Sequence, residues 1–163
     1  MTCFTERKLV GLLRFLNGLW SSSKFTMLSP RVPHFIRWIK PPSSLLFLNC
    51  DGALGKEGCD RGVGGVLRDS NGNFVWGFAY KGPAGLDVLA TECVAMHTSL
   101  MKAAELGMSS FLVASDLQEV VALLKNELGE IWSNLGNIVD EIRRLMVLLA
   151  VGDVRFQPRL GTA

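Results

Sequence analysis

This sequence lacks the features of a membrane protein or of a disulfide-rich secreted protein. No apolar run approaches the roughly 18 residues that a membrane-spanning helix needs, so we expect no membrane association. Cysteine is scarce, and the four cysteines are Cys3, Cys50, Cys59 and Cys93. They show neither CxxC spacing nor the density of a disulfide scaffold. We therefore predict a reducing compartment and no zinc site.

Acidic residues are almost missing from the first 40 positions, which hold one acid against seven Lys or Arg, while the rest of the chain holds fourteen acids against ten. The chain of 163 residues, 48% of them apolar, suits a single globular domain. We divide it into a basic leader (1–40) and a domain (41–163). The leader fits an organelle transit peptide, a disordered basic tail or the remnant of a longer upstream domain. We expect a nuclear or cytoplasmic location by default, and an organellar location if the leader is a transit peptide.

A phosphate-binding loop is also lacking. Gly62, Gly64 and Gly65 complete neither G-x-G-x-x-G nor Gly-Lys-Ser/Thr, and they lead into a strand rather than a helix. We interpret them as strand glycines that permit close backbone approach. Lys56 and Arg61 flank the preceding Gly-rich stretch, and we interpret both as solvated loop charges.

What is present is a regular series of strand and helix patterns. The predicted strands are 45–48, 62–69, 74–80, 111–114 and 154–157, and the predicted helices are 87–106, a short one after Asp116, and 131–150. Asn71-Gly72 predicts a tight hairpin, because both residues tolerate positive φ. The order β-β-β-α-β-α-α-β predicts an α/β fold with a mixed sheet, its last strands parallel to the first and its surface covered by helices.

Three isolated carboxylates occupy unusual places in this pattern. Asp51 lies where the first strand leaves the core, Glu92 in the first turns of a helix, and Asp116 at the carboxyl end of the fourth strand. Each has an ordinary explanation, respectively a turn residue, a solvated acid favoured by the helix dipole, and an N-cap. The ends of the first and fourth strands are neighbours in this topology, so the three can also converge.

Converging carboxylates would need a cation, because like charges a few ångströms apart repel. A site with oxygen ligands alone suits Mg²⁺ or Mn²⁺. Two such ions about 4 Å apart are the usual device for phosphodiester hydrolysis. The predicted chemistry is therefore hydrolysis of a nucleic acid.

Several segments together resemble the ribonuclease H-like domain of plant retroelement-type and stand-alone (type 1) ribonuclease H proteins, over about residues 38–159. They are Trp38-Ile39-Lys40-Pro41-Pro42, Leu48-Asn49-Cys50-Asp51-Gly52-Ala53, Gly64-Gly65-Val66-Leu67-Arg68-Asp69 with Asn71-Gly72, Thr91-Glu92, Ala114-Ser115-Asp116 with Val120-Val121, and Phe156-Gln157-Pro158-Arg159. The resemblance implies a five-stranded mixed sheet and cleavage of the RNA strand of RNA–DNA hybrids. It also implies Mg²⁺ held by a set of acidic residues, and Asp51, Glu92 and Asp116 correspond to members of that set as catalytic metal ligands. We expect the chain to be a monomer.

The sequence departs from this family at its end. The resemblance implies a further Asp and a final helix beyond the Arg that aligns with Arg159, whereas Thr162 stands at the family's Asn position and Ala163 is the last residue. We therefore expect activity that is low or lost. The alternatives are a non-catalytic module that binds RNA or hybrids and an inert retroelement remnant. The acidic balance of residues 41–163 argues against a dedicated binding module, because phosphate attracts basic surfaces.

Overall fold

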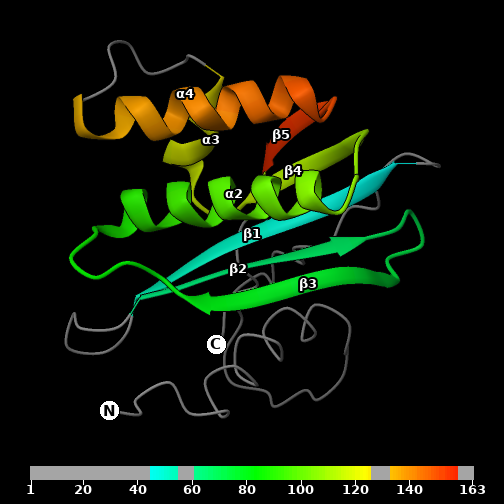
Figure 1. Cartoon of the computed structure of the whole chain (residues 1–163), viewed down its shortest axis with the longest axis horizontal. Helices are drawn as coiled ribbons and strands as arrows, with labels where there is room; N and C mark the ends of the chain where they lie inside the picture. The colour runs from blue at the N-terminus through cyan, green and yellow to red at the C-terminus, as the bar shows by residue number, and fades with distance from the viewer. Residues whose placement is uncertain (1–44, 55–60, 126–132, 158–163) are drawn as a thin grey trace, which may run out of the picture.

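A computed structural model describes residues 45–54, 61–125 and 133–157. They form strands and helices in the order that the sequence predicts (Figure 1). The elements are β1 (Leu46–Leu54), β2 (Arg61–Arg68), β3 (Phe74–Lys81), α2 (Val88–Glu105), β4 (Phe111–Ser115), α3 (Gln118–Leu124), α4 (Ser133–Leu148) and β5 (Asp153–Phe156). The predicted leader (1–40), Lys56 and the chain beyond Gln157 lie outside the described residues. No helix in the described ranges is both long and apolar enough to cross a bilayer.

The five strands form one mixed sheet in the order β3-β2-β1-β4-β5. β2 pairs antiparallel with both β1 and β3, whereas β4 pairs parallel with both β1 and β5. The predicted parallel arrangement of the last strands with the first is thus confirmed. The pairing of β1 with β4 ends at Cys50 and Ser115. The next residues along each chain segment, Asp51 and Asp116, are therefore neighbours where these two strands separate.

The hairpin between β2 and β3 forms where Asn71-Gly72 predicts it, but with a different turn. Gly72 has a φ of 88°, whereas Asn71 does not have a positive φ. The amide of Gly72 donates to the carbonyl of Asp69 (2.9 Å), and the amide of Asp69 donates to the carbonyl of Asn73 (3.0 Å). Ser70 and Asn71 are therefore the central residues of the turn, and glycine supplies the left-handed residue that follows it. Positive φ is needed at Gly72 alone.

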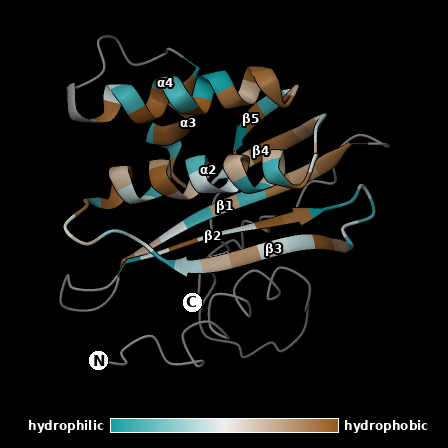
Figure 2. Cartoon of the chain, in the orientation of Figure 1, coloured by the Kyte–Doolittle hydropathy of each residue, from teal (hydrophilic) through white to brown (hydrophobic). Residues whose placement is uncertain are grey.

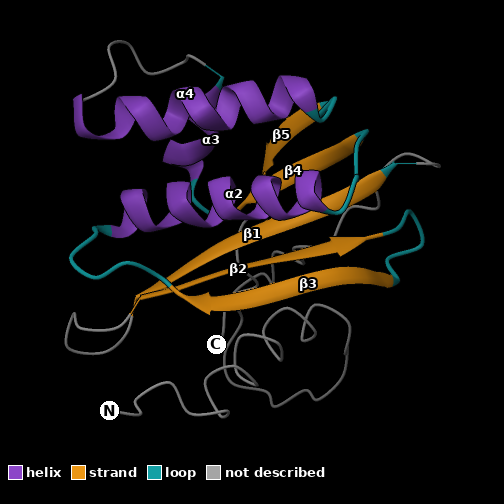
Figure 3. Ribbon diagram, viewed as in Figure 1, coloured by secondary structure: helices purple, strands orange, loops and turns teal. Residues whose placement is uncertain are grey.

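Within the described residues, α2, α3 and α4 all pack on one face of the sheet (Figure 3). Side chains alternate along β1, so Leu48 and Cys50 face the helices, while Phe47 faces the other side with Leu112 and Ala114 of β4. The helices carry mixed hydrophobic and hydrophilic surfaces (Figure 2). Their buried apolar residues in the core include Cys93, Met96, Leu100, Ala103, Val120, Val121, Leu124, Leu135, Val139, Ile142 and Leu145.

Helix α2 begins and ends where its sequence predicts. Asp87 is the N-cap, and its Oδ1 accepts a hydrogen bond from the amide of Ala90 (2.7 Å). Gly107 follows the last turn with a φ of 66°, a conformation that costs glycine little. The ends of two later elements differ slightly from prediction. Helix α4 (Ser133–Leu148) ends two residues early, while residues 131 and 132 lie outside the described residues. Strand β5 begins one residue early, at Asp153, because its pairing with β4 starts there.

Candidate active site

Asp51 lies within β1 rather than at its end. The sequence predicts that the strand leaves the core at this residue, but β1 continues to Leu54 because it stays paired with β2 as far as Arg61. The interpretation of Asp51 as a turn residue is therefore wrong. Beyond Cys50, β1 has β2 on one side and the segment after β4 on the other. Asp51 is only 6% exposed at this junction.

Glu92 is a buried residue of α2, with 2% of its surface exposed, so its interpretation as a solvated acid is wrong. Both of its carboxylate oxygens have a neutral donor. The amide of Gly52 donates to Oε1 (3.0 Å), and the hydroxyl of Ser115 donates to Oε2 (3.4 Å). Donors from two different strands thus hold one carboxylate, which α2 places beside the point where β1 and β4 separate.

The absence of a side chain at Gly52 allows α2 to lie this close to β1. A Cβ at that position would stand 3.0 Å from two backbone atoms of α2, the nitrogen of Glu92 and the carbonyl carbon of Thr91. Backbone atoms within a helix cannot easily move aside. Thr91 is itself buried, and its hydroxyl donates to the carbonyl of Asp87 (2.6 Å), so this helix start is tightly held. Gly52 is therefore a packing residue of the site.

Asp116 follows β4 and is half-buried. Its interpretation as an N-cap is wrong, because the N-cap of α3 is Leu117, which makes no side-chain capping bond. The hydroxyl of Ser115 instead accepts a hydrogen bond from the amide of Leu117 (3.2 Å). Asp116 precedes the N-cap residue, and its carboxylate lies beside those of Asp51 and Glu92.

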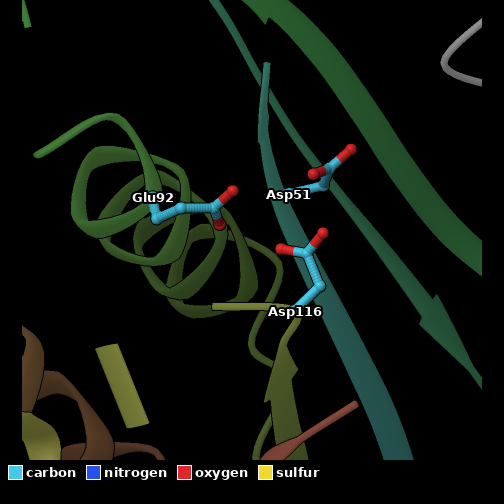
Figure 4. A group of neighbouring side chains, drawn as sticks. All are labelled: Asp51, Glu92 and Asp116. Carbon is cyan, nitrogen blue, oxygen red and sulfur yellow. The ribbon is translucent and has the colours of Figure 1, made fainter. Parts of the chain in front are cut away.

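The three carboxylates converge, as the sequence predicts. Each offers one oxygen, and these oxygens lie within 4.8 Å of one another. Figure 4 shows the side chains pointing towards one region from β1, from α2 and from the end of β4. This is the one group of three or more potential metal-binding side chains found among the described residues.

The donor chemistry of this cluster fits a divalent cation. Carboxylates at this spacing repel one another, and the repulsion is stronger where the side chains are buried. A cation between them would remove it. Because all the donors are oxygens, a hard ion such as Mg²⁺ or Mn²⁺ fits better than zinc.

Two thiols lie beside the acidic residues in the sequence, and both are buried. Burial, together with the negative charges of Glu92 and Asp51, raises the pKa of Cys50 to about 12, although a hydrogen bond with Ser99 acts in the opposite direction. Burial and the charges of Glu92 and Asp87 raise the pKa of Cys93 to about 12. Both thiols are therefore protonated near neutral pH, and neither is a plausible metal ligand or nucleophile.

The sequence interpretation missed Gly52 and Ser115, which shape the site, and misjudged Arg61 in β2. In the sequence, Gly52 and Ser115 stand out only as neighbours of Asp51 and Asp116. The apolar residues that follow Gly52 were the available sign that the strand continues. Arg61 is not a solvated loop charge, since it is 9% exposed in β2 and its Nε donates to the carbonyl of Leu86 (2.9 Å).

Comparison with protein families matches residues 49–161 to the model described as reverse transcriptase-like. This span includes Asp51, Glu92 and Asp116. No curated protein matches the chain.

Comparison with solved structures finds RNase H folds. RNase H1 from the archaeon Halobacterium salinarum is 21% identical with a TM-score of 0.64, and the match covers 70% of this chain and 86% of that one. The N-terminal RNase H domain of a Mycobacterium tuberculosis protein is 16% identical with a TM-score of 0.63, covering 72% and 84%. LC11-RNase H1, isolated from compost by a metagenomic approach and solved in complex with an RNA/DNA hybrid, is 16% identical with a TM-score of 0.62, covering 70% and 86%.

Proposed function

The chain belongs to the reverse transcriptase-like family and has the RNase H-like fold, and from this we propose that it is a metal-dependent nuclease acting on the RNA strand of RNA–DNA hybrids. The observation that carries the proposal is the convergence of Asp51, Glu92 and Asp116 on one sheet junction, with oxygens within 4.8 Å of one another. The hybrid is the proposed substrate because a structure with this fold, LC11-RNase H1, was solved with one bound.

In this proposal Asp51, Glu92 and Asp116 hold Mg²⁺ or Mn²⁺. Such ions activate water and stabilise the charge on the leaving oxygen in phosphodiester cleavage. The protein's own contribution is to hold the ligands in place. The amide of Gly52 and the hydroxyl of Ser115 orient the Glu92 carboxylate, and the burial of Asp51 and Glu92 keeps the charges in a region of low dielectric.

The direct test is cleavage of a hybrid whose RNA strand is labelled, by the purified full chain with Mg²⁺ or Mn²⁺. Single-stranded RNA, RNA duplex and DNA duplex serve as comparison substrates. Both metals are titrated, because three carboxylates hold a cation less tightly than a larger set. Asp51→Asn is the test variant, since it keeps the shape of the side chain and removes its charge. Asp69→Asn is the matched control, since it makes the same change in a turn far from the site.

Metal-dependent cleavage of the RNA strand that is lost in Asp51→Asn and kept in Asp69→Asn supports the proposal. Equal cleavage by Asp51→Asn would point to a contaminating nuclease and contradict it. Binding of the hybrid without cleavage, by a folded protein, would replace the enzyme with a binding module. Neither binding nor cleavage would favour an inert remnant.

A further inference from the structure

Ser115 is a buried hydroxyl at the junction of the candidate site. It is the last residue of β4, is 2% exposed, and pairs in the sheet with Cys50 of β1. It therefore immediately precedes Asp116 and lies one ladder step from Asp51. Its polar group would be costly to bury without partners. The partners it has are both parts of the site.

The Ser115 hydroxyl links two of the three carboxylates. It accepts a hydrogen bond from the amide of Leu117 (3.2 Å), which closes a turn around Asp116. It also donates to Oε2 of Glu92 (3.4 Å). A hydroxyl has one hydrogen to donate and lone pairs to accept with, so both bonds can exist together. One oxygen atom thus connects the backbone around Asp116 to the carboxylate of Glu92.

The second donor matters because one hydrogen bond does not fix a glutamate carboxylate. The last torsion of glutamate is broad, so the amide of Gly52 on Oε1 restricts the carboxylate less than donors on both oxygens do. The Ser115 hydroxyl on Oε2 adds a second restraint. Ser115 is therefore placed to fix the direction of Glu92 and, through Leu117, the position of Asp116.

We infer that Ser115 is a positioning residue of the proposed metal centre, and that its hydroxyl holds Glu92 and Asp116 in the arrangement that binds a divalent cation. This inference rests on the proposed function. Ser115 contacts its ligands rather than the reacting atoms. Loss of such an outer contact typically weakens metal binding by about 10- to 100-fold.

The test is calorimetric titration of the full chain with Mn²⁺, which needs no turnover. We expect Ser115→Ala to bind Mn²⁺ about tenfold more weakly than the unmodified chain. Ser115→Thr, which keeps the hydroxyl, should bind nearly as well as the unmodified chain. Ser99→Ala is the matched control, because Ser99 is also fully buried but its hydroxyl contacts the carbonyl of Ala95 and the thiol of Cys50 rather than a carboxylate of the site. Circular dichroism checks that each variant is folded.

Each outcome decides something. If the unmodified chain binds Mn²⁺ and Ser115→Ala binds it equally well, this inference fails while the proposed function stands. If the unmodified chain binds no Mn²⁺, both fail. A folded Ser115→Thr as weak as Ser115→Ala would also contradict a role for the hydroxyl. If Ser115→Ala does not fold, Ser115→Cys replaces it, because a thiol has a similar shape and donates weakly. Weaker Mn²⁺ binding by Ser115→Cys supports the inference, and unchanged Mn²⁺ binding overturns it.

Discussion

Carboxylates at the two ends of the sheet are held in different ways. Asp69, in the hairpin at the end opposite the start of α2, finds its donors within four residues (Figure 1). Its Oδ1 accepts from the amides of Asn71 (2.9 Å) and Asn73 (2.8 Å), and its Oδ2 accepts from Nδ2 of Asn73 (2.9 Å). Glu92 instead accepts from Gly52, 40 residues earlier, and from Ser115, 23 residues later.

The difference separates a structural carboxylate from a candidate ligand. Asp69 is stabilised by its own turn and lies apart from the acidic cluster. The fold brings Glu92 to two other carboxylates, where each added negative charge is unfavourable without a cation. An arrangement that folding alone would not favour is an indication of function.

Replacing the carboxylate by an amide at Glu92 and at Asp69, at the two ends of the sheet, should give the largest difference in cleavage rate. We expect Glu92→Gln to lower metal-dependent hybrid cleavage by at least about 100-fold, because a ligand charge is lost while the shape is kept. Asp69→Asn should cleave at the rate of the unmodified chain. Initial rates at saturating Mn²⁺ measure both. Similar losses in the two variants would mean that the cluster has no special role.

Substitution of two glycines tests the strand–helix contact. Gly52→Ala should destabilise the fold by about 1–3 kcal/mol, because its Cβ would press on the backbone of α2. Gly136→Ala, in α4, should stabilise by about 0.5–1 kcal/mol, because nothing lies within 4 Å of its Cβ and alanine loses less entropy in a helix. Urea unfolding measures both changes. Tolerance of alanine at Gly52 would show that α2 does not need this close approach.

Local patterns predicted most of the fold, and distant contacts account for what they missed. The strands and helices follow from periodicity and from end signals such as Asp87 and Gly107, all of which are local. The burial of Glu92 is not local, because it depends on the missing side chain at Gly52 in a different element. An acid in the first turns of a helix is ordinarily solvated, so α2 alone could not have shown it.

The strand boundary at Asp51 and the residue at which α3 begins were misjudged for similar reasons. An Asp-Gly pair after an apolar run ordinarily ends a strand, and only the pairing of β1 with β2 carries it on to Leu54. An Asp before a helix ordinarily caps it, but α3 begins one residue later than the pattern predicts, with Leu117 as its N-cap. Convergence was still predictable, because it follows from the topology of β1 and β4.

The contribution of the Asp69 carboxylate to the stability of the fold should depend modestly on pH. Hydrogen bonds from the side chain and amide of Asn73 and from the amide of Asn71 hold the pKa of Asp69 below its ordinary 3.8. Its contribution to stability is therefore complete above about pH 4 and is lost as the pH falls through the lowered value. Melting temperatures of the unmodified chain and of Asp69→Asn, measured from pH 7 to pH 2, should differ at neutral pH and approach one another in acid. A difference that grows in acid would contradict this sign.

The smallest effect concerns the two buried thiols. Burial raises the pKa of Cys50 and Cys93 to about 12, so only about one thiol in 10⁴ is ionised at pH 8. Alkylation with iodoacetamide should be slow at both residues in the native chain and fast in urea. Mass spectrometry of the peptides measures each site separately. Rapid native labelling of Cys50 would show that this part of β1 opens to solvent.

The most direct measurement is a crystal of the full chain soaked in Mn²⁺, examined by anomalous diffraction. We predict a peak among the oxygens of Asp51, Glu92 and Asp116, about 2 Å from the atoms that bind it. The same soak of Asp51→Asn should lose the peak or weaken it strongly. Ordered carboxylates at this junction with no peak between them, at a saturating Mn²⁺ concentration, would contradict the metal centre and the nuclease proposed from it.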